Sequence, residues 1–184
     1  MVFENVTQYG RALARVLVEV DSRCLRRKRY LARRAFLLAV GIVAVLCGGF
    51  LLLVFGELDM PSRAICVGDL IVGILFLWKG IFFRRMMVWQ TVRGMTEGTR
   101  RALFTEEEMQ VEHPGVQKGC FYYSTVTAFY ETEGCFILPL STGPKNRLTS
   151  IVLDKGGFTQ GTVAEFRMFI QERTGKAVRF VNCR

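Results

Sequence analysis

Two apolar runs dominate the pattern of the chain, residues 35–55 and residues 64–83. The first has 21 residues and no charge, and a helix of that length is about 30 Å long, the thickness of the hydrocarbon core of a bilayer. The intervening segment contains Gly56 and Pro61, which suit a tight turn. A hairpin buried in a soluble protein is the alternative, but it needs a larger surrounding core than this chain offers. The pattern therefore predicts a transmembrane helical hairpin over residues 35–83.

The segments on both sides of the hairpin are polar and basic. Within residues 1–34, Val6, Leu13 and Val20 mark apolar positions at roughly helical spacing. This spacing predicts a basic amphipathic helix over residues 1–34 that leads directly into the first span. Residues 84–101 predict a second basic segment, a juxtamembrane helix or linker in which Gly94 and Gly98 weaken the helix.

From residue 102 onward the pattern changes to short strands and one helix. Met109, Val111 and His113 alternate with polar residues, as in a half-buried strand. Further strand-like stretches follow at 118–134, 135–140 and 148–153, and residues 176–184 suggest a last short strand. Thr162 and Glu165 fit the capping box of a helix over residues 162–175. The order predicts an α+β domain over residues 102–184.

The positive charge is concentrated beside the hairpin. The net charge is +9, yet residues 102–184 carry nine Lys and Arg against nine acids. Basic residues near the ends of membrane spans favour the cytoplasmic side, so the distribution predicts that both termini are cytoplasmic. The same residues are candidates for contacts with anionic lipid head groups, or they set the topology and do nothing more. They are Arg26, Arg27, Lys28, Arg29, Arg33, Arg34, Arg84 and Arg85.

Asp69 and Lys79 are the charged positions inside the second run. Measured from the ends of that run, both lie near enough to an interface to reach it, and interfacial positioning is the favoured explanation. The alternative is that the two charges line a transport path in an oligomer. Small residues in both runs allow close helix packing; they are Gly41, Ala44, Gly48, Gly68, Gly73 and Gly80.

Three stretches carry a resemblance to a known family: FTEEEMQV (104–111), YSTVTAFYETEGCFIL (123–138) and LDKGGFTQGTVAEFRMFIQERTGKAV (153–178). They resemble the C-terminal domain of the YcxB-like bacterial membrane proteins, whose layout of basic segment, two spans and domain is also similar. The resemblance implies a pleckstrin-homology-like antiparallel sheet or partial barrel, closed by one C-terminal helix, at the bacterial inner membrane. It implies no reaction. The family commonly has Pro before the position of Lys155, where this chain has Asp154.

The sequence contains no pattern typical of an enzyme or of a metal site. His113 is its single histidine, and the phosphate-binding and nucleophile motifs are absent. The six cysteines show no metal-ligand spacing, and the acidic run 106–108 is typical of a solvated turn. The neutral C-terminal domain has no basic stripe of the kind that binds nucleic acid. We therefore expect no catalytic residues, no cofactor and no metal.

The expected function is that of a non-catalytic membrane protein that presents a pleckstrin-homology-like domain to the cytoplasm as an adaptor, sensor or scaffold. A protein partner or a second copy would bind the domain by strand addition or apolar docking. The candidate contact residues are Phe121, Tyr122, Tyr123, Phe129 and Tyr130. A small transporter or channel subunit using Asp69 and Lys79 is one alternative function. Binding of anionic lipid head groups is the other.

Overall fold

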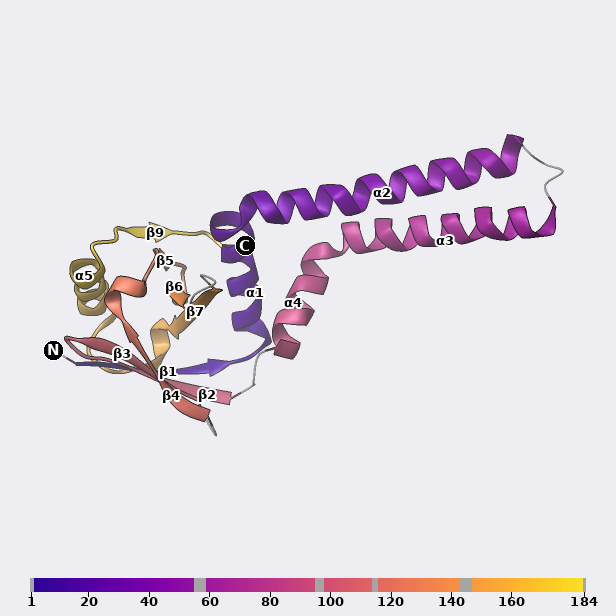
Figure 1. Cartoon of the computed structure of the whole chain (residues 1–184). Coiled ribbons are helices and arrows are strands. Elements are labelled where there is room, and N and C mark those ends of the chain that lie inside the picture. The colour runs from indigo at the N-terminus through magenta and orange to yellow at the C-terminus, as the bar shows by residue number, and fades with distance from the viewer. Residues whose placement is uncertain (1, 55–58, 95–97, 114–115, 143–146, 184) are drawn as a thin grey trace. The chain divides into compact units, whose positions relative to one another are not determined.

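The computed structural model describes residues 2–54, 59–94, 98–113, 116–142 and 147–183, which form two compact units (Figure 1). One unit contains Met1–Val20 together with Thr91–Arg184, and the other contains Asp21–Gln90. The first unit is therefore built from both ends of the chain, and the second is inserted between them.

Five antiparallel strands form one sheet of the first unit, in the order β4-β3-β2-β1-β8. β1 pairs with β2 along its whole length, from Phe3 opposite Phe104 to Tyr9 opposite Gly98. The strand before the inserted unit is thus the direct neighbour of the strand after it. The bounds are β1 (Phe3–Tyr9), β2 (Gly98–Phe104), β3 (Glu108–His113), β4 (Val116–Tyr122) and β8 (Phe158–Gln160).

Four strands form the second sheet, in the order β7-β6-β5-β9. β5 and β9 are parallel, and the other pairs are antiparallel. Short 3-10 helices at Tyr123–Thr125 and Lys155–Gly157 connect the strands, and the second of them links β7 to β8 in the other sheet. The bounds are β5 (Phe129–Glu131), β6 (Cys135–Thr142), β7 (Arg147–Asp154) and β9 (Val178–Phe180).

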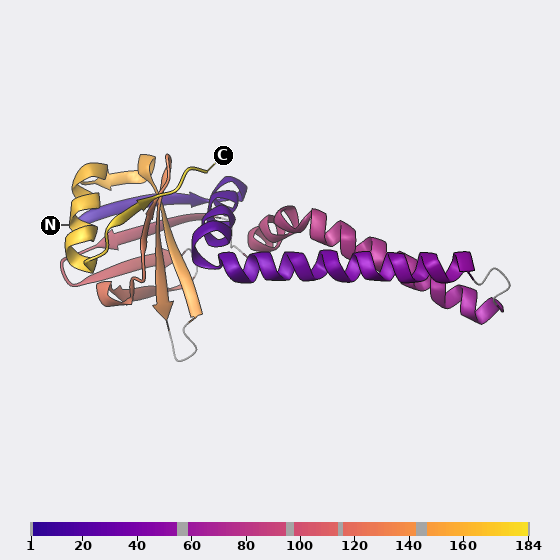
Figure 2. The same cartoon turned by 90° about the horizontal axis from the view of Figure 1, so that it is seen from above.

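Helix α5 (Val163–Thr174) lies against one end of the two sheets (Figure 2). It begins with a complete capping box between Thr162 and Glu165, and ends at Gly175, whose φ of 62° suits glycine. The side chain of Phe166 is fully buried among aromatic rings from both sheets. The ring centroids are 4.9 Å away for Phe104, 5.0 Å for Phe158, 5.5 Å for Phe3 and 5.5 Å for Phe136.

Side chains of β1 connect the two sheets through the backbone of β7. Tyr9 donates from its hydroxyl to the carbonyl of Val152 (3.0 Å) and accepts from the Val152 amide (3.2 Å). Thr7 accepts from the amide of Asp154 (2.8 Å), and the Asn5 amide donates to the Asp154 carbonyl (2.7 Å). β7 is the edge strand of its sheet, so its outer backbone groups have no neighbouring strand. Buried side chains of β1 thus supply the hydrogen bonds that a paired strand would make.

Helix α1 (Arg11–Val20) belongs to the same unit and follows β1 directly. Leu13, Ala14 and Val18 are buried, whereas Arg11 and Arg15 are exposed. One apolar face and one polar face are typical of a helix on the surface of a globular domain. The amphipathic character expected for this segment is therefore present in residues 11–20.

The inserted unit is helical. A π-helical turn at Asp21–Leu25 leads to α2 (Arg27–Val54), which packs against α3 (Met60–Ile81), and α4 begins directly after α3 (Figure 1). α4 (Phe83–Gly94) carries the chain back to the first unit. Two long apolar helices packed as a hairpin, beside an α+β unit, agree with the coarse architecture expected from the sequence.

The prediction of one helix over residues 1–34 is wrong at its start, because Phe3–Tyr9 forms a strand. The side chains of this strand alternate between buried and less buried positions, and the inward side includes the polar Asn5 and Thr7. Because Asn5 and Thr7 are polar, a search for alternating apolar residues assigns them to the surface and does not detect the strand. The segment expected as a linker is also shorter than predicted, because β2 starts at Gly98.

Replacing Tyr9 with Phe tests the connection between the sheets. The substitution keeps the ring but leaves the amide and carbonyl of Val152 without their partner, so we expect the free energy of unfolding to fall by about 1–3 kcal/mol. Tyr122→Phe is the matched control, because Tyr122 is 66% exposed. Denaturant unfolding of the full chain in detergent measures both variants. Equal stabilities for the two would contradict the assigned role of Tyr9.

Candidate membrane anchor

Glycines allow the two long helices to approach closely. A Cβ atom added at Gly41 would lie 2.8 Å from the backbone nitrogen of Leu77, and one added at Gly73 would lie 2.9 Å from that of Val45. Gly48 and Gly80 are similarly close to the opposite helix. Gly68 has no atom within 4 Å of the Cβ position. Four of the five glycines predicted as packing residues thus lie between the helices, and Gly68 does not.

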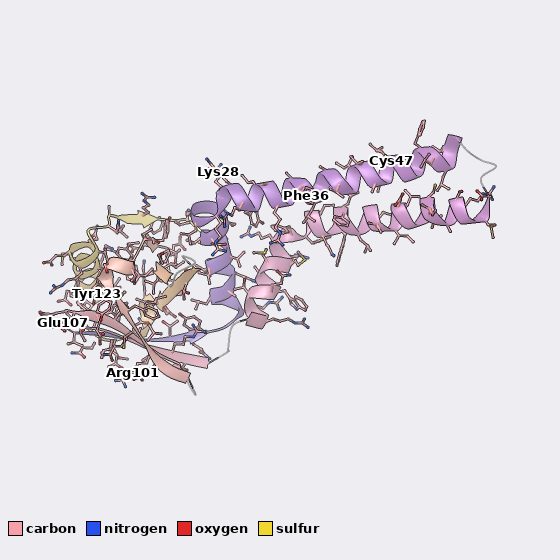
Figure 3. All side chains as sticks on the ribbon, viewed as in Figure 1. Lys28, Phe36, Cys47, Arg101, Glu107 and Tyr123 are labelled. Atoms are coloured by element: carbon pink, nitrogen blue, oxygen red, sulfur yellow. The ribbon has the colours of Figure 1, made fainter. Side chains whose placement is uncertain are left out.

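The outward faces of the hairpin are apolar and exposed. Phe36, Leu46, Phe50, Ile65 and Trp78 each expose 60% or more of their surface, and Figure 3 labels Phe36 and Cys47 on α2. By length and composition, residues Arg27–Leu53 and Ser62–Ile81 are sufficient to cross a membrane. The core helices of a soluble protein bury their apolar side chains, whereas these helices expose most of theirs.

One end of the hairpin is basic. Leu38 packs near Gly80, and the rings of Tyr30 and Phe83 lie 5.0 Å apart, so the start of α2 lies at the same end as the start of α4. All eight basic residues singled out from the sequence lie at this end and are exposed, and Figure 3 labels Lys28. Arg26 has an acidic neighbour in Asp21, 3.5 Å away. The structure therefore gathers these charges into one basic end.

Asp69 and Lys79 are both exposed on α3 but do not form a pair. They are ten residues apart in the sequence, which corresponds to about 15 Å along the helix and about 80° around its axis. Within one copy, the structure does not bring the two charges into a common path.

A buried charge cluster in the β-sheet unit is not predicted by the sequence. The carboxylate of Glu131 accepts from the Arg167 guanidinium at 2.8 and 2.6 Å and from the Lys155 ammonium at 2.8 Å. The Glu131 side chain is 7% exposed. The hydrogen bonds from Arg167 hold its pKa below the usual range, burial opposes them, and Lys155 reinforces them. The cluster joins β5, α5 and the β7–β8 connection, so it fixes the fold rather than offering a free carboxylate.

The predicted partner surface is mostly interior. Phe129 is fully buried, and Tyr130 and Tyr123 are only 4% and 7% exposed. The Tyr123 hydroxyl donates to the Thr105 carbonyl at 2.5 Å, and burial raises the pKa of Tyr123. Phe121 packs against the core. These four residues therefore do not form a contact surface in this fold, and Tyr122, at the end of the edge strand β4, is the exposed member of the set.

The acidic run does not assemble into a carboxylate pair. Glu106 lies 3.7 Å from Arg173, whereas Glu108 accepts from the Gln110 side chain at 2.7 Å. Figure 3 labels the exposed Glu107 between them. Among the described residues, no group of three or more His, Cys, Asp or Glu side chains is placed to hold a metal ion. The side chain of His113 lies outside the described part of the chain.

Comparison with protein-family models, with curated proteins and with solved structures finds no match for this chain. The resemblance to the YcxB-like proteins therefore stays a prediction that rests on the three stretches quoted above.

Replacing Glu131 with Gln tests the buried cluster. Because the pKa of Glu131 is lowered in the folded protein, its contribution to stability is complete well above the ordinary value of 4.5 and is lost as the pH falls through the folded pKa. We expect Glu131→Gln to lower the free energy of unfolding at pH 7 by about 2–3 kcal/mol, less than the roughly 3–5 kcal/mol typical of breaking a buried ion pair, because Arg167 is 37% exposed. Toward pH 3 the difference from the parent protein should shrink.

Glu133→Gln is the matched control, because Glu133 is exposed two residues further along the chain. Unfolding curves of the full chain in detergent, recorded at several pH values, provide the comparison. A constant difference between Glu131→Gln and the parent protein at all pH values would contradict the assigned ionisation.

Proposed function

We propose that this chain is an integral protein of the cytoplasmic membrane, with the α2–α3 hairpin as its anchor and the β-sheet unit as a non-catalytic interaction domain in the cytoplasm. The main support for this proposal is the surface of the hairpin, which is apolar and exposed along both helices and basic at one end. A lipid bilayer covers such apolar surface, and basic residues favour the cytoplasmic side.

The pairing of β1 with β2 supports the same topology. β1 precedes the hairpin, β2 follows it, and the two strands are hydrogen-bonded neighbours. A folded β-sheet unit therefore requires both flanks of the hairpin to lie on one side of the membrane. Two spans satisfy that requirement, and a single span does not.

For the β-sheet unit we propose a pleckstrin-homology-like fold. The arrangement that supports it is two antiparallel meanders, β1–β4 and β5–β7, followed by the C-terminal helix α5 against one end of the sheets. In this proposal the helical hairpin is an insertion between the first two strands. The proposed role is presentation of the unit to a protein partner, and the edge strand β4 with the exposed Tyr122 is the available contact.

Reporter tags on the full chain test the topology. We expect tags at the N-terminus and the C-terminus to be accessible from the cytoplasm, and a tag inserted in segment 56–58 to be accessible from the opposite side. Neutralising the basic end, by replacing Arg26, Arg27, Lys28 and Arg29 with Gln, should shift part of the population to the inverted orientation. As the control, the same number of Gln replacements at the exposed positions Arg101, Arg173, Lys176 and Arg179 should leave the orientation unchanged. Tags on opposite sides at the two termini would contradict the proposal.

A further inference from the structure

Asp69 lies deep within the apolar part of α3. It is seven residues after Ser62 and twelve before Ile81, the ends of the candidate membrane span, which places it about 10 Å from one end and about 18 Å from the other. Lys79 is two residues from Ile81. Because α3 already begins at Met60, Asp69 is further from the helix start than the run from residue 64 suggests.

The two charges therefore differ in how they can reach water. The long side chain of Lys79 can extend to the interface, as Lys and Arg side chains do. Asp69 has a single methylene group and cannot cover 10 Å. No hydrogen bond or ion pair joins the Asp69 carboxylate to the described part of the chain, although an ionised Asp is strongly disfavoured within a span. The described part of the chain therefore offers the Asp69 carboxylate no compensating group.

Asp69 lies on an exposed side of α3, beside the strip that contacts α2. Cys66 and Gly73, three residues before it and four after it, both lie against α2. Ile65 and Val72 lie four residues before and three after Asp69, so they share its side of the helix, and they are 66% and 46% exposed. This face is an apolar strip with one acidic group, open to a further helix.

We propose that Asp69 forms an ion pair, inside the membrane, with a Lys or Arg side chain on a transmembrane helix of a different protein. The inference rests on the proposed function, because it requires the hairpin to span the membrane. Charge complementarity identifies the partner. The apolar strip of α3 packs against the partner's helix, and the basic residue of that helix lies at the depth of Asp69.

A second copy of this chain does not supply the complement. Two copies with the same topology place their Asp69 carboxylates at the same depth, where like charges repel. The basic residues of α3 in a second copy, Arg63 and Lys79, lie six and ten residues away along the helix, about 9 Å and 15 Å from that depth. Self-association therefore places no basic residue at the depth of Asp69.

The test uses the full chain, labelled with a fluorophore, in phosphatidylcholine vesicles that contain a labelled host peptide. The peptide is a Leu/Ala transmembrane helix with one Lys about 10 Å from one end. Energy transfer measures the association. We expect the parent protein and Asp69→Glu to bind this peptide, and Asp69→Leu to bind it about tenfold more weakly, within the range found for polar contacts between membrane helices. Lys79→Leu, as the matched control, should bind like the parent.

Two further peptides, with Leu or Glu in place of the Lys, should bind about tenfold more weakly than the Lys peptide. Equal binding of all three peptides, or full binding by Asp69→Leu, would overturn the inference. Energy transfer between copies of this chain without peptide, if abolished by Asp69→Leu, would instead identify a second copy as the partner and also overturn it. Flotation and carbonate resistance of the vesicle-bound protein are measured first. Protein that does not integrate into the vesicle membrane contradicts the proposed function. Protein that integrates, but whose peptide binding does not depend on Asp69, contradicts this inference alone.

Discussion

The structure depends on the hydrogen bonds between side chains of β1 and the free edge of β7. Tyr9, Thr7 and Asn5 satisfy the outer backbone groups of Val152 and Asp154, so one strand completes the five-stranded sheet and closes the edge of the other. Buried backbone groups without partners are costly. The N-terminal residues are therefore an integral part of the β-sheet unit, although the inserted hairpin separates them from the rest of it in the sequence.

This constraint also determines where the hairpin is inserted. β1 and β2 are neighbours, so the chain has to leave the β-sheet unit and return to the same side of it. An inserted pair of antiparallel helices meets that condition, and the glycines at their contact allow them to pack closely. The β-sheet unit is then joined to the helical hairpin through two chain connections, one on each side of the insertion. The inserted hairpin and the fold of the β-sheet unit are consequences of one topology.

The sequence was sufficient for the elements whose signals are local. The hairpin followed from two long apolar runs, and α5 followed from Thr162, Glu165 and Gly175, all of which act within one helix. β1 was missed because Asn5 and Thr7 are polar and their partner Asp154 is almost 150 residues away. The Glu131 cluster was missed for the same reason, because Lys155 and Arg167 come from separate elements that are distant in the sequence. The aromatic stretch around Phe129 was assigned to a surface, since composition alone does not distinguish a buried aromatic strand from an exposed one.

A disulfide between the strands on either side of the hairpin tests directly whether the hairpin is inserted between β1 and β2. Gln8 and Thr99 are both exposed and lie opposite each other in the β1–β2 pair, where cross-strand Cβ atoms are about 4.5–5.5 Å apart. In a background without native cysteines, the double variant Gln8→Cys and Thr99→Cys should form an intramolecular disulfide in the full chain, in protein that stays with the membrane after carbonate extraction. Membrane-integrated protein in which the two cysteines do not react with each other would contradict a hairpin inserted between paired strands.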